Sequence, residues 1–257
     1  MEVHQHAHHG GKKNWKSYFW EFLMLFLAVT LGFLVENQRE HYIEHLRAKE
    51  FSKTLVKDLQ HDTATIHVQK KSAEIYIAIT DSLLALSKMK LEGRAASQFS
   101  FYTRFVYWTV PITWNRSTFE QIKNSGSLRY FKNYQLLEKM MKYEALVNHI
   151  ESEAYNRTVR GNLLLKHIDV IIEPAYHQEL SKHFLYSLDT MSRKTMETLY
   201  PINPESLESR RSEIREMLNL TIVQQRNLQR DIEISWKQAE ELAIELINDL
   251  KREYRIN

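Results

Sequence analysis

The chain has 257 residues, a formal net charge of +3 and no cysteine. The missing cysteines exclude a disulfide framework and thiolate chemistry, and the near-balanced charge offers no broad basic footprint for nucleic acid. Only six glycines and four prolines interrupt the chain. So few helix breakers predict long helices with few turns, and we expect an all-α fold.

Residues 1–14 form a histidine-rich tail, which begins MEVHQHAHHGG. Clustered imidazoles can bind zinc or copper, but no acidic or thiolate partner completes a site here. We interpret this stretch as a flexible polar tail. The sequence predicts no metal and no cofactor.

Residues 15–36 are predicted to form a transmembrane anchor. No charged residue occurs from Phe22 to Val35, and with the preceding aromatic residues the stretch reaches the roughly 17–20 residues that a helix needs to cross a bilayer. A cleaved signal peptide would need small residues at its exit, but Glu36-Asn37-Gln38-Arg39 follows instead. A buried helix of a soluble protein would have a polar face, which this stretch lacks. We therefore predict a retained single-pass signal anchor.

Four residues of the anchor are candidates for membrane-interface or packing roles. Trp15 and Trp20 belong to the aromatic cluster at its start, where such rings favour the membrane interface. Glu21 is the one ionisable group in the apolar span, so it suggests either an interfacial or packing role or a place in an ion pathway. Gly32 follows Ala28 at helical spacing, which would let two spans approach closely.

The domain from residue 37 to residue 257 is predicted to be a helical bundle. Its first part runs to Gly93 without a breaker, and apolar residues such as Leu55, Leu59 and Ile66 recur at helical spacing. A helix over residues 37–91 would extend about 80 Å. Two clusters, His41/Glu44/His45 and Asp58/His61, resemble metal ligands. However, the chain lacks the Glu-x-x-His motif of di-iron bundles, so we interpret both as surface residues.

Residues 93–133 form an aromatic insert with short helices. Pro111 is expected to end one helix, Ser117–Glu120 to form a capping box, Ser125-Gly126 to stop that helix, and Asn133 to cap the next. The aromatic residues suggest either the wall of a ligand pocket or a compact plug between helix ends. The candidates are Phe101, Phe105, Trp108, Trp114, Phe119, Tyr130 and Phe131.

The anchor and the stretch TFEQIKNSGSLRYFKNYQLLEKMMKYE together resemble an uncharacterised family of bacterial single-pass membrane proteins, a domain of unknown function. The resemblance covers residues 19–60 and 113–145. It departs at the anchor exit, where such proteins carry Asn-x-Trp or Asn-Trp and this chain has Asn37-Gln38-Arg39. The resemblance implies an anchored helical protein of the bacterial inner membrane and no catalytic residue.

The rest of the chain also has helical spacing. Residues 134–173, 175–200 and 205–254 are each predicted to be helical, with Pro174 and the prolines at 201 and 204 between them. Gln225 interrupts the apolar stripe of the last segment, and a strict heptad does not persist. We expect this last helix to pack beside the one that leaves the membrane.

The basic residues on the two sides of the anchor do not clearly favour either orientation in the membrane. Lys12, Lys13 and Lys16 precede the span, and Arg39 and Arg47 follow it. A short basic N-terminus before a long domain is the usual signal-anchor layout. We therefore predict a cytoplasmic N-terminus and an extracytoplasmic bundle.

The sequence favours a noncatalytic scaffold or sensor that acts through helix packing. It contains no Gly-rich phosphate loop, nucleophile elbow, metalloprotease motif or kinase signature, so we do not expect an enzyme. Two alternatives are an ion-pathway subunit that uses Glu21 and a ligand-binding domain that uses the aromatic insert. The expected partners are the lipid bilayer and either a second copy or another membrane protein.

Overall fold

The computed structural model describes residues 14–107, 112–182 and 191–256. The chain divides into two compact units, Met1–Glu50 and Phe51–Asn257. In the described part of both units the regular elements are helices, without a strand. The predicted all-α fold is therefore confirmed.

The described part of the first unit consists of helix α1 (Trp15–Ser87) up to residue 50. Helix α1 is long and apolar enough to cross a membrane, judged by length and composition. Its most apolar 18-residue window contains no buried residue. Side chains on all sides of this stretch are exposed, for example Phe22, Leu25 and Phe33 at 65%, 67% and 71%.

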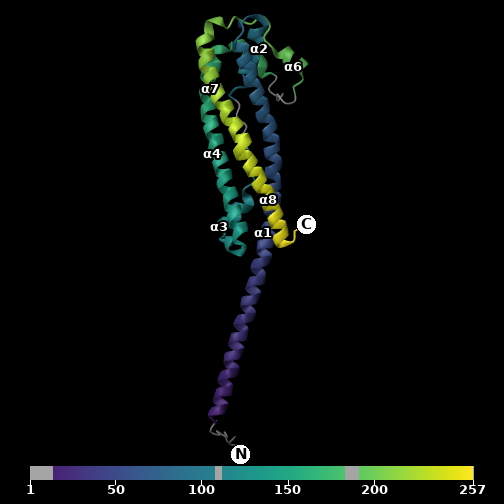
Figure 1. The fold of residues 1–257 in the computed structure, drawn as a ribbon, viewed down its shortest axis with the longest axis vertical. Helices are drawn as coiled ribbons and strands as arrows, with labels where there is room; N and C mark the ends of the chain where they lie inside the picture. Colours follow the sequence, from purple (N-terminus) through teal and green to yellow (C-terminus); the bar gives the residue numbers. More distant parts are fainter. Residues whose placement is uncertain (1–13, 108–111, 183–190, 257) are drawn as a thin grey trace, which may run out of the picture. The chain divides into compact units, whose positions relative to one another are not determined.

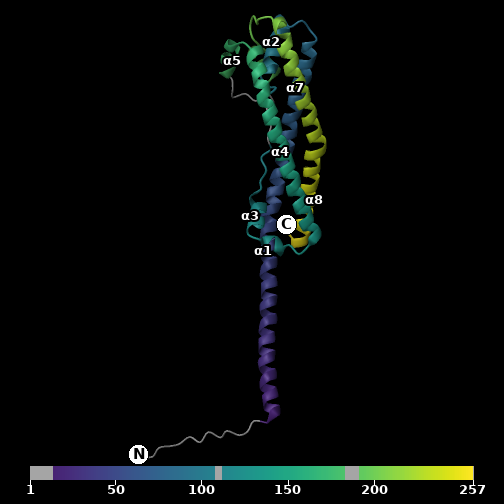
Figure 2. The same ribbon diagram turned by 90° about the vertical axis from the view of Figure 1, so that its left-hand side faces the viewer.

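The second unit is built on three long helical stretches, which Figures 1 and 2 show side by side. They are residues 51–87 of α1, helix α4 (Tyr134–Ile171), and a C-terminal stretch made of α7 (Arg211–Arg230), the π-helix η3 (Asp231–Trp236) and α8 (Lys237–Tyr254). The predicted packing of the last segment beside α1 is observed. Lys70 Nζ of α1 contacts Glu240 of α8, and Gln225 Nε2 of α7 donates to Ile77 O of α1 at 3.1 Å.

Shorter helices close the two ends of this bundle (Figures 1 and 2). Helices α2 (Gly93–Thr103), α5 (Pro174–Ser181), α6 (Arg193–Leu199) and η2 (Glu208–Arg210) lie at the end where α4 stops. Helices α3 (Ser117–Asn124) and η1 (Ser127–Tyr130) lie at the other end. The single helix predicted over 175–200 is wrong, because Ser192 is extended (ψ 152°) and its side chain caps α6.

Two predicted turn residues behave as expected. Gly126 follows α3 with φ 68°, a left-handed conformation that glycine adopts without a steric penalty. Asn133 Oδ1 accepts from the Leu136 N–H at 3.2 Å and so caps α4. These two residues set the direction in which the chain enters the second long helix.

The C-terminal stretch carries one residue more than its packing pattern requires. One series of its buried positions advances by alternate steps of three and four residues, at 214, 217, 221, 224, 228, 231 and 235, and Leu218 and Gln225 are buried beside this series. After Ser235 the same pattern resumes one position later, at 236, 239, 243, 246 and 250. A regular helix would turn its buried face by about 100° at such a slip, because it has 3.6 residues per turn.

The π-helix η3 lies at this slip. A π-turn closes its hydrogen bonds over five residues instead of four, so it accommodates one extra residue while the helix continues in the same direction. Ser235 and Trp236 are consequently both buried. The one-residue shift in the buried pattern at η3 explains why the sequence does not keep a strict heptad.

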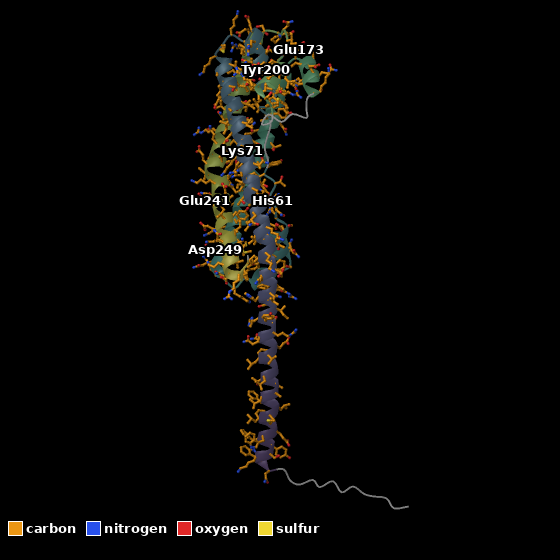
Figure 3. All side chains as sticks on the ribbon, turned by 90° about the vertical axis from the view of Figure 1, so that its right-hand side faces the viewer. His61, Lys71, Glu173, Tyr200, Glu241 and Asp249 are labelled. Atoms are coloured by element: carbon orange, nitrogen blue, oxygen red, sulfur yellow. The ribbon has the colours of Figure 1, made fainter. Side chains whose placement is uncertain are left out.

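Deleting Glu233, an exposed residue of η3, is expected to leave the stability of the protein near its wild-type value. The deletion removes the surplus residue and brings the two halves of the buried pattern into phase. Deleting Glu241, exposed on α8 (Figure 3), is the matched control. That deletion moves Lys251 and Arg255 into the buried places of Leu250 and Tyr254 and is expected to cost several kcal/mol, on the order of ~3–5. Thermal unfolding measures both, and equal losses would contradict this account.

Candidate functional site

The four predicted anchor residues lie on the exposed surface of α1. Trp15 and Trp20 are 82% and 61% exposed, and the Trp15 ring stacks on Phe19 with centroids 6.3 Å apart. Glu21 is exposed as well. A Cβ atom at Gly32 would meet no heavy atom within 4 Å, so this surface has room for a neighbouring helix.

The six aromatic candidates that the structure describes are buried but do not gather in one place. Phe101 contacts Phe105 and Tyr200 at the end of the bundle near α2 and α6, with centroids 5.2 Å apart in both pairs. Phe131 meets Tyr254 at the opposite end, at 6.0 Å. Tyr130 is also buried, within η1.

Two further aromatic candidates lie in the lower half of the bundle. Trp114 packs edge-on against Tyr143 with centroids 6.4 Å apart. Phe119 lines a small cavity beside them. Trp108 lies outside the described residues.

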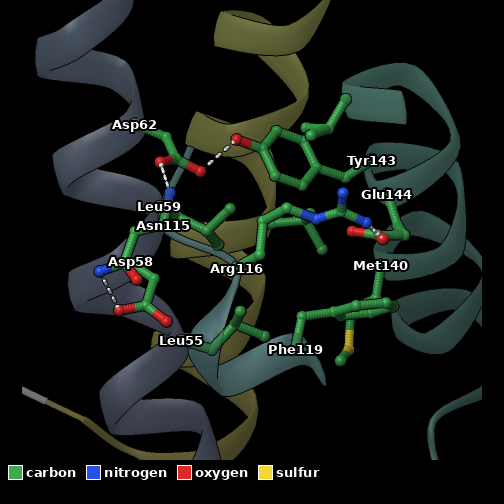
Figure 4. Close-up of a pocket in the computed structure, with 12 residues that line it drawn as sticks. Leu55, Asp58, Leu59, Asp62, Asn115, Arg116, Phe119, Met140, Tyr143 and Glu144 are labelled. Atoms are coloured by element: carbon green, nitrogen blue, oxygen red, sulfur yellow. Dashed lines mark hydrogen bonds and ion pairs between the residues drawn. The ribbon is translucent and has the colours of Figure 1, made fainter. Parts of the chain in front are cut away.

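This cavity is the centre of a buried polar cluster, shown in Figure 4. Its volume is about 20 Å³, enough for about one water molecule. It lies where residues 115–119 pass between α1 and α4. We call the residues that line it and carry polar side chains the polar clamp: Asp58, Asp62, Asn115, Arg116, Tyr143 and Glu144.

Asp62 joins three segments of the chain. One carboxylate oxygen accepts from the Asn115 backbone N–H at 2.8 Å, and the other accepts from the Tyr143 hydroxyl at 2.8 Å. The residue is only 2% exposed. A carboxylate this buried requires such donors, because an unpaired buried acceptor costs about 1–3 kcal/mol.

The interpretation of Asp58 as a surface residue is wrong, because Asp58 is 7% exposed and caps α3 from another helix. Its Oδ2 accepts from the Thr118 N–H at 3.2 Å, and its Oδ1 accepts from Asn115 Nδ2 at 2.8 Å. The capping box predicted at Ser117 is wrong, since the N-cap of α3 is Arg116 and no side-chain cap bond forms there. The carboxylate of Asp58 instead satisfies a free N–H at the helix start.

Arg116 binds the opposite wall of the clamp. Its guanidinium contacts Glu144 of α4 and donates to Glu151 Oε2 at 2.9 Å. It also lies 3.4 Å from Glu120 of α3. One cation thus balances three carboxylates and ties α3 to α4, while Asp58 and Asp62 tie the same segment to α1.

Burial raises the pKa of two clamp residues, Asp62 and Tyr143. Desolvation raises the pKa of Asp62, although the bonds from Asn115 and Tyr143 and the nearby His61 oppose that rise. Desolvation and the charge of Asp62 raise the pKa of Tyr143 far above its usual value. The Tyr143 hydroxyl therefore remains a donor at neutral pH.

A second polar cluster lies at the π-helix. The guanidinium of Arg157 on α4 forms an ion pair with Asp231 Oδ2, and both side chains are at most 5% exposed. Desolvation lowers the pKa of Arg157 and raises that of Asp231. Nearby, Arg230 Nη2 lies 3.8 Å from both Glu153 and Asp231.

Several buried polar atoms around this ion pair have no hydrogen-bond partner in the described structure. They include Asp231 Oδ1, Gln224 Nε2 and Trp236 Nε1. All three residues are at least 97% buried. Of the three atoms, Asp231 Oδ1 lies 3.8 Å from a cation, the guanidinium of Arg230.

Sequence reasoning missed both clusters, although each left a signal. Asp62 occupies the step between Leu59 and Ile66 in the apolar stripe of α1, and Asp231 follows Leu228 by three residues in the stripe of α7. A carboxylate in an apolar stripe indicates a buried partner of opposite charge or a donor. The partners Tyr143 and Arg157 are remote in sequence and could not be assigned from it.

The clamp holds segments together and has no spare ligands. Its two aspartates are each bound by two internal donors. Within residues 14–107, 112–182 and 191–256, no group of three or more His, Asp or Glu side chains is placed to hold a metal ion. The suggested pair of His41 and Glu44 lies 3.6 Å apart as a surface contact.

Substituting Asp62 by alanine is expected to destabilise the bundle by about 2–5 kcal/mol, because it leaves two buried donors, the Asn115 N–H and the Tyr143 hydroxyl, without an acceptor. Asp62→Asn keeps one acceptor oxygen and should cost less. Chemical denaturation of the full-length chain measures the difference. A loss no larger than that of Glu241→Gln, at an exposed position, would contradict the role of Asp62 as a joint.

Stability should also depend on pH through Asp62. Its carboxyl has a higher pKa in the folded chain than in the unfolded chain, so the folded state binds more protons between the ordinary aspartate pKa of about 3.9 and the raised value. The free energy of unfolding contributed by this group therefore falls as the pH rises through that interval. The cost of Asp62→Asn should accordingly be smaller at pH 7 than at pH 4. A cost that grows with pH would show that the carboxylate is the favoured form.

Comparison with protein-family models, with curated proteins and with solved structures gives no match for this chain. The resemblance to a bacterial single-pass family stays a prediction. The geometry of the two polar clusters indicates a structural role, in which buried polar contacts join neighbouring helices.

Proposed function

We propose that the protein is a membrane-anchored, noncatalytic helical scaffold or sensor that acts through helix packing. The observation that carries this proposal is that no residue in the apolar window of α1 is buried. In water, each large apolar side chain left exposed forgoes about 1.5–3 kcal/mol of transfer free energy. A bilayer is the solvent that removes this cost along the whole stretch.

The end of the apolar stretch supports a retained anchor. Helix α1 continues through residues 36–39, where Arg39 Nε donates to Glu36 Oε2 at 2.9 Å. A polar i,i+3 pair of this kind favours a helix that leaves the membrane and continues in water. A cleaved leader would end in small residues instead.

The buried polar clusters support a packing role for the second unit. Asp58 and Asp62 of α1 and Arg116 beside α3 all bind internal partners, and these partners come from residue 115, α3 and α4. Helix α1 contributes Asp58 and Asp62 to the clamp, so the proposed signal is a shift of residues 51–87 of this helix against α3 and α4. Small helix shifts of this type are a common means of transmitting a signal.

The proposed location is the bacterial inner membrane, with a single pass and an extracytoplasmic bundle. The partners that fit this location are the lipid bilayer and a second copy or another membrane protein. The exposed surface around Gly32 suits close approach of another span.

The full-length chain, carrying a reporter at residue 257, is expected in the membrane pellet after ultracentrifugation and in the supernatant only with detergent. The reporter should be active outside the cytoplasm, and the mass of the product should include residues 15–36. The matched variant Leu27→Arg/Val29→Arg places two charges at the centre of the span, which is costly in hydrocarbon, and should release the chain from the pellet. Full-length protein in the detergent-free supernatant would refute the anchor, and a cytoplasmic reporter would reverse the orientation.

A further inference from the structure

We propose that the C-terminal stretch has two packing registers, and that the ion pair between Arg157 and Asp231 selects the one observed. In this register the surplus residue sits in η3, between residues 231 and 236. In the second register it would sit closer to residue 214, and residues 218–235 would be rotated by about 100°, the turn of one helical residue. This inference deepens the proposed sensor role and supplies the element that a signal would move.

The sequence of α7 offers two alternative buried faces. The observed face between Ile214 and Ser235 includes Thr221, Gln224 and Asp231. The pattern of α8 can instead be extended backwards from Trp236 by the same steps of four and three. That extension passes through residues 232, 229, 225, 222 and 218.

The second face is the more apolar of the two. It contains Leu218, Ile222 and Ile232, with Gln225 and Gln229 between them. Leu218 and Gln225 are already 7% and 8% exposed, whereas Ile222 is 40% exposed. Rotation would therefore bury Ile222 and Ile232 in place of Thr221 and Asp231.

The observed register carries costs that bring the two registers closer in free energy. Asp231 Oδ1 and Gln224 Nε2 are buried in it without hydrogen bonds among the described residues. Rotation would carry Gln224 and Asp231 toward solvent, where water satisfies them. Rotation thus exposes Thr221 and Asp231 and buries Ile222 and Ile232, which favours the second register. It also exposes Leu228 and buries Gln229 in its place, which favours the observed one.

The ion pair at Arg157 decides against the rotation. Arg157 belongs to α4 and is 4% exposed, so it needs a carboxylate beside it. Rotation would remove Asp231, its ion-pair partner, and leave Glu153 on the same helix as the remaining acidic neighbour of the guanidinium. Glu153 and Arg230, the ionic neighbours at 3.8 Å, would separate as well. Setting the register of a helix is the best-attested role of buried polar and ionic groups.

The missing cysteines make the register directly measurable. Thr221→Cys and Ile222→Cys each place one thiol in the full-length chain, at positions that are 0% and 40% exposed. A maleimide reagent should label the thiol at 222 readily and the thiol at 221 slowly. Arg157→Met removes the cation, keeps most of the side-chain volume and leaves Asp231 buried without its partner.

In Arg157→Met the two labelling rates are expected to exchange, each by about tenfold or more, as when a two-state population is inverted. Arg157→Met/Asp231→Leu is the first control, because an apolar pair should retain the observed register. Deleting Glu233 in Arg157→Met is the second control, because it removes the surplus residue and should also keep the original rates.

Unchanged labelling in Arg157→Met would overturn the proposal. Equal and fast labelling at both positions would overturn it too, because the segment would then have lost its only folded register. Either result leaves the membrane anchor standing, which the pelleting experiment tests separately. An exchange of rates that both controls abolish would establish the two registers.

Discussion

The structure of the second unit depends on one constraint: a polar side chain that enters its narrow core must meet a partner there. Three long helical stretches leave little room for water, so a buried carboxylate selects the segment that brings it a donor. Asp62 accepts hydrogen bonds from the backbone of residue 115 and from the hydroxyl of Tyr143, and Asp231 forms an ion pair with Arg157. Apolar contacts hold the helices together but do little to fix their axial alignment. These polar pairings determine which residues of neighbouring helices lie opposite one another.

The two polar clusters satisfy this constraint to different degrees. In the clamp, every oxygen of Asp58 and Asp62 has a donor, and the connecting segment 115–119 is held against α1. At the π-helix, one oxygen of Asp231 has none. Within the clamp, Arg116 Nε also has no hydrogen-bond partner among the described residues, so the two clusters differ in the pairing of their carboxylates.

Much of the fold could be predicted from the sequence, because it depends on local patterns. The breaker-free run of α1, the left-handed turn at Gly126 and the cap at Asn133 all follow from residues close together in the chain. The capping box at Ser117 was predicted wrongly because a carboxylate 60 residues earlier supplies the cap. The clamp and the Arg157–Asp231 pair could not be derived for the same reason, since their partners are 53 to 81 residues apart. The slip in the last helix was visible only as an imperfect heptad.

The contact between Lys70 and Glu240 joins residues 170 positions apart. A chain leaving the ribosome therefore exposes the inner face of α1 through most of its synthesis, because the stretch that covers this face is translated late. Long-range closure of this kind is slow compared with helix formation. For the nascent protein, α4 is the first long helix available to shield the apolar residues of α1, and the loop through residue 126 decides how early that shielding begins.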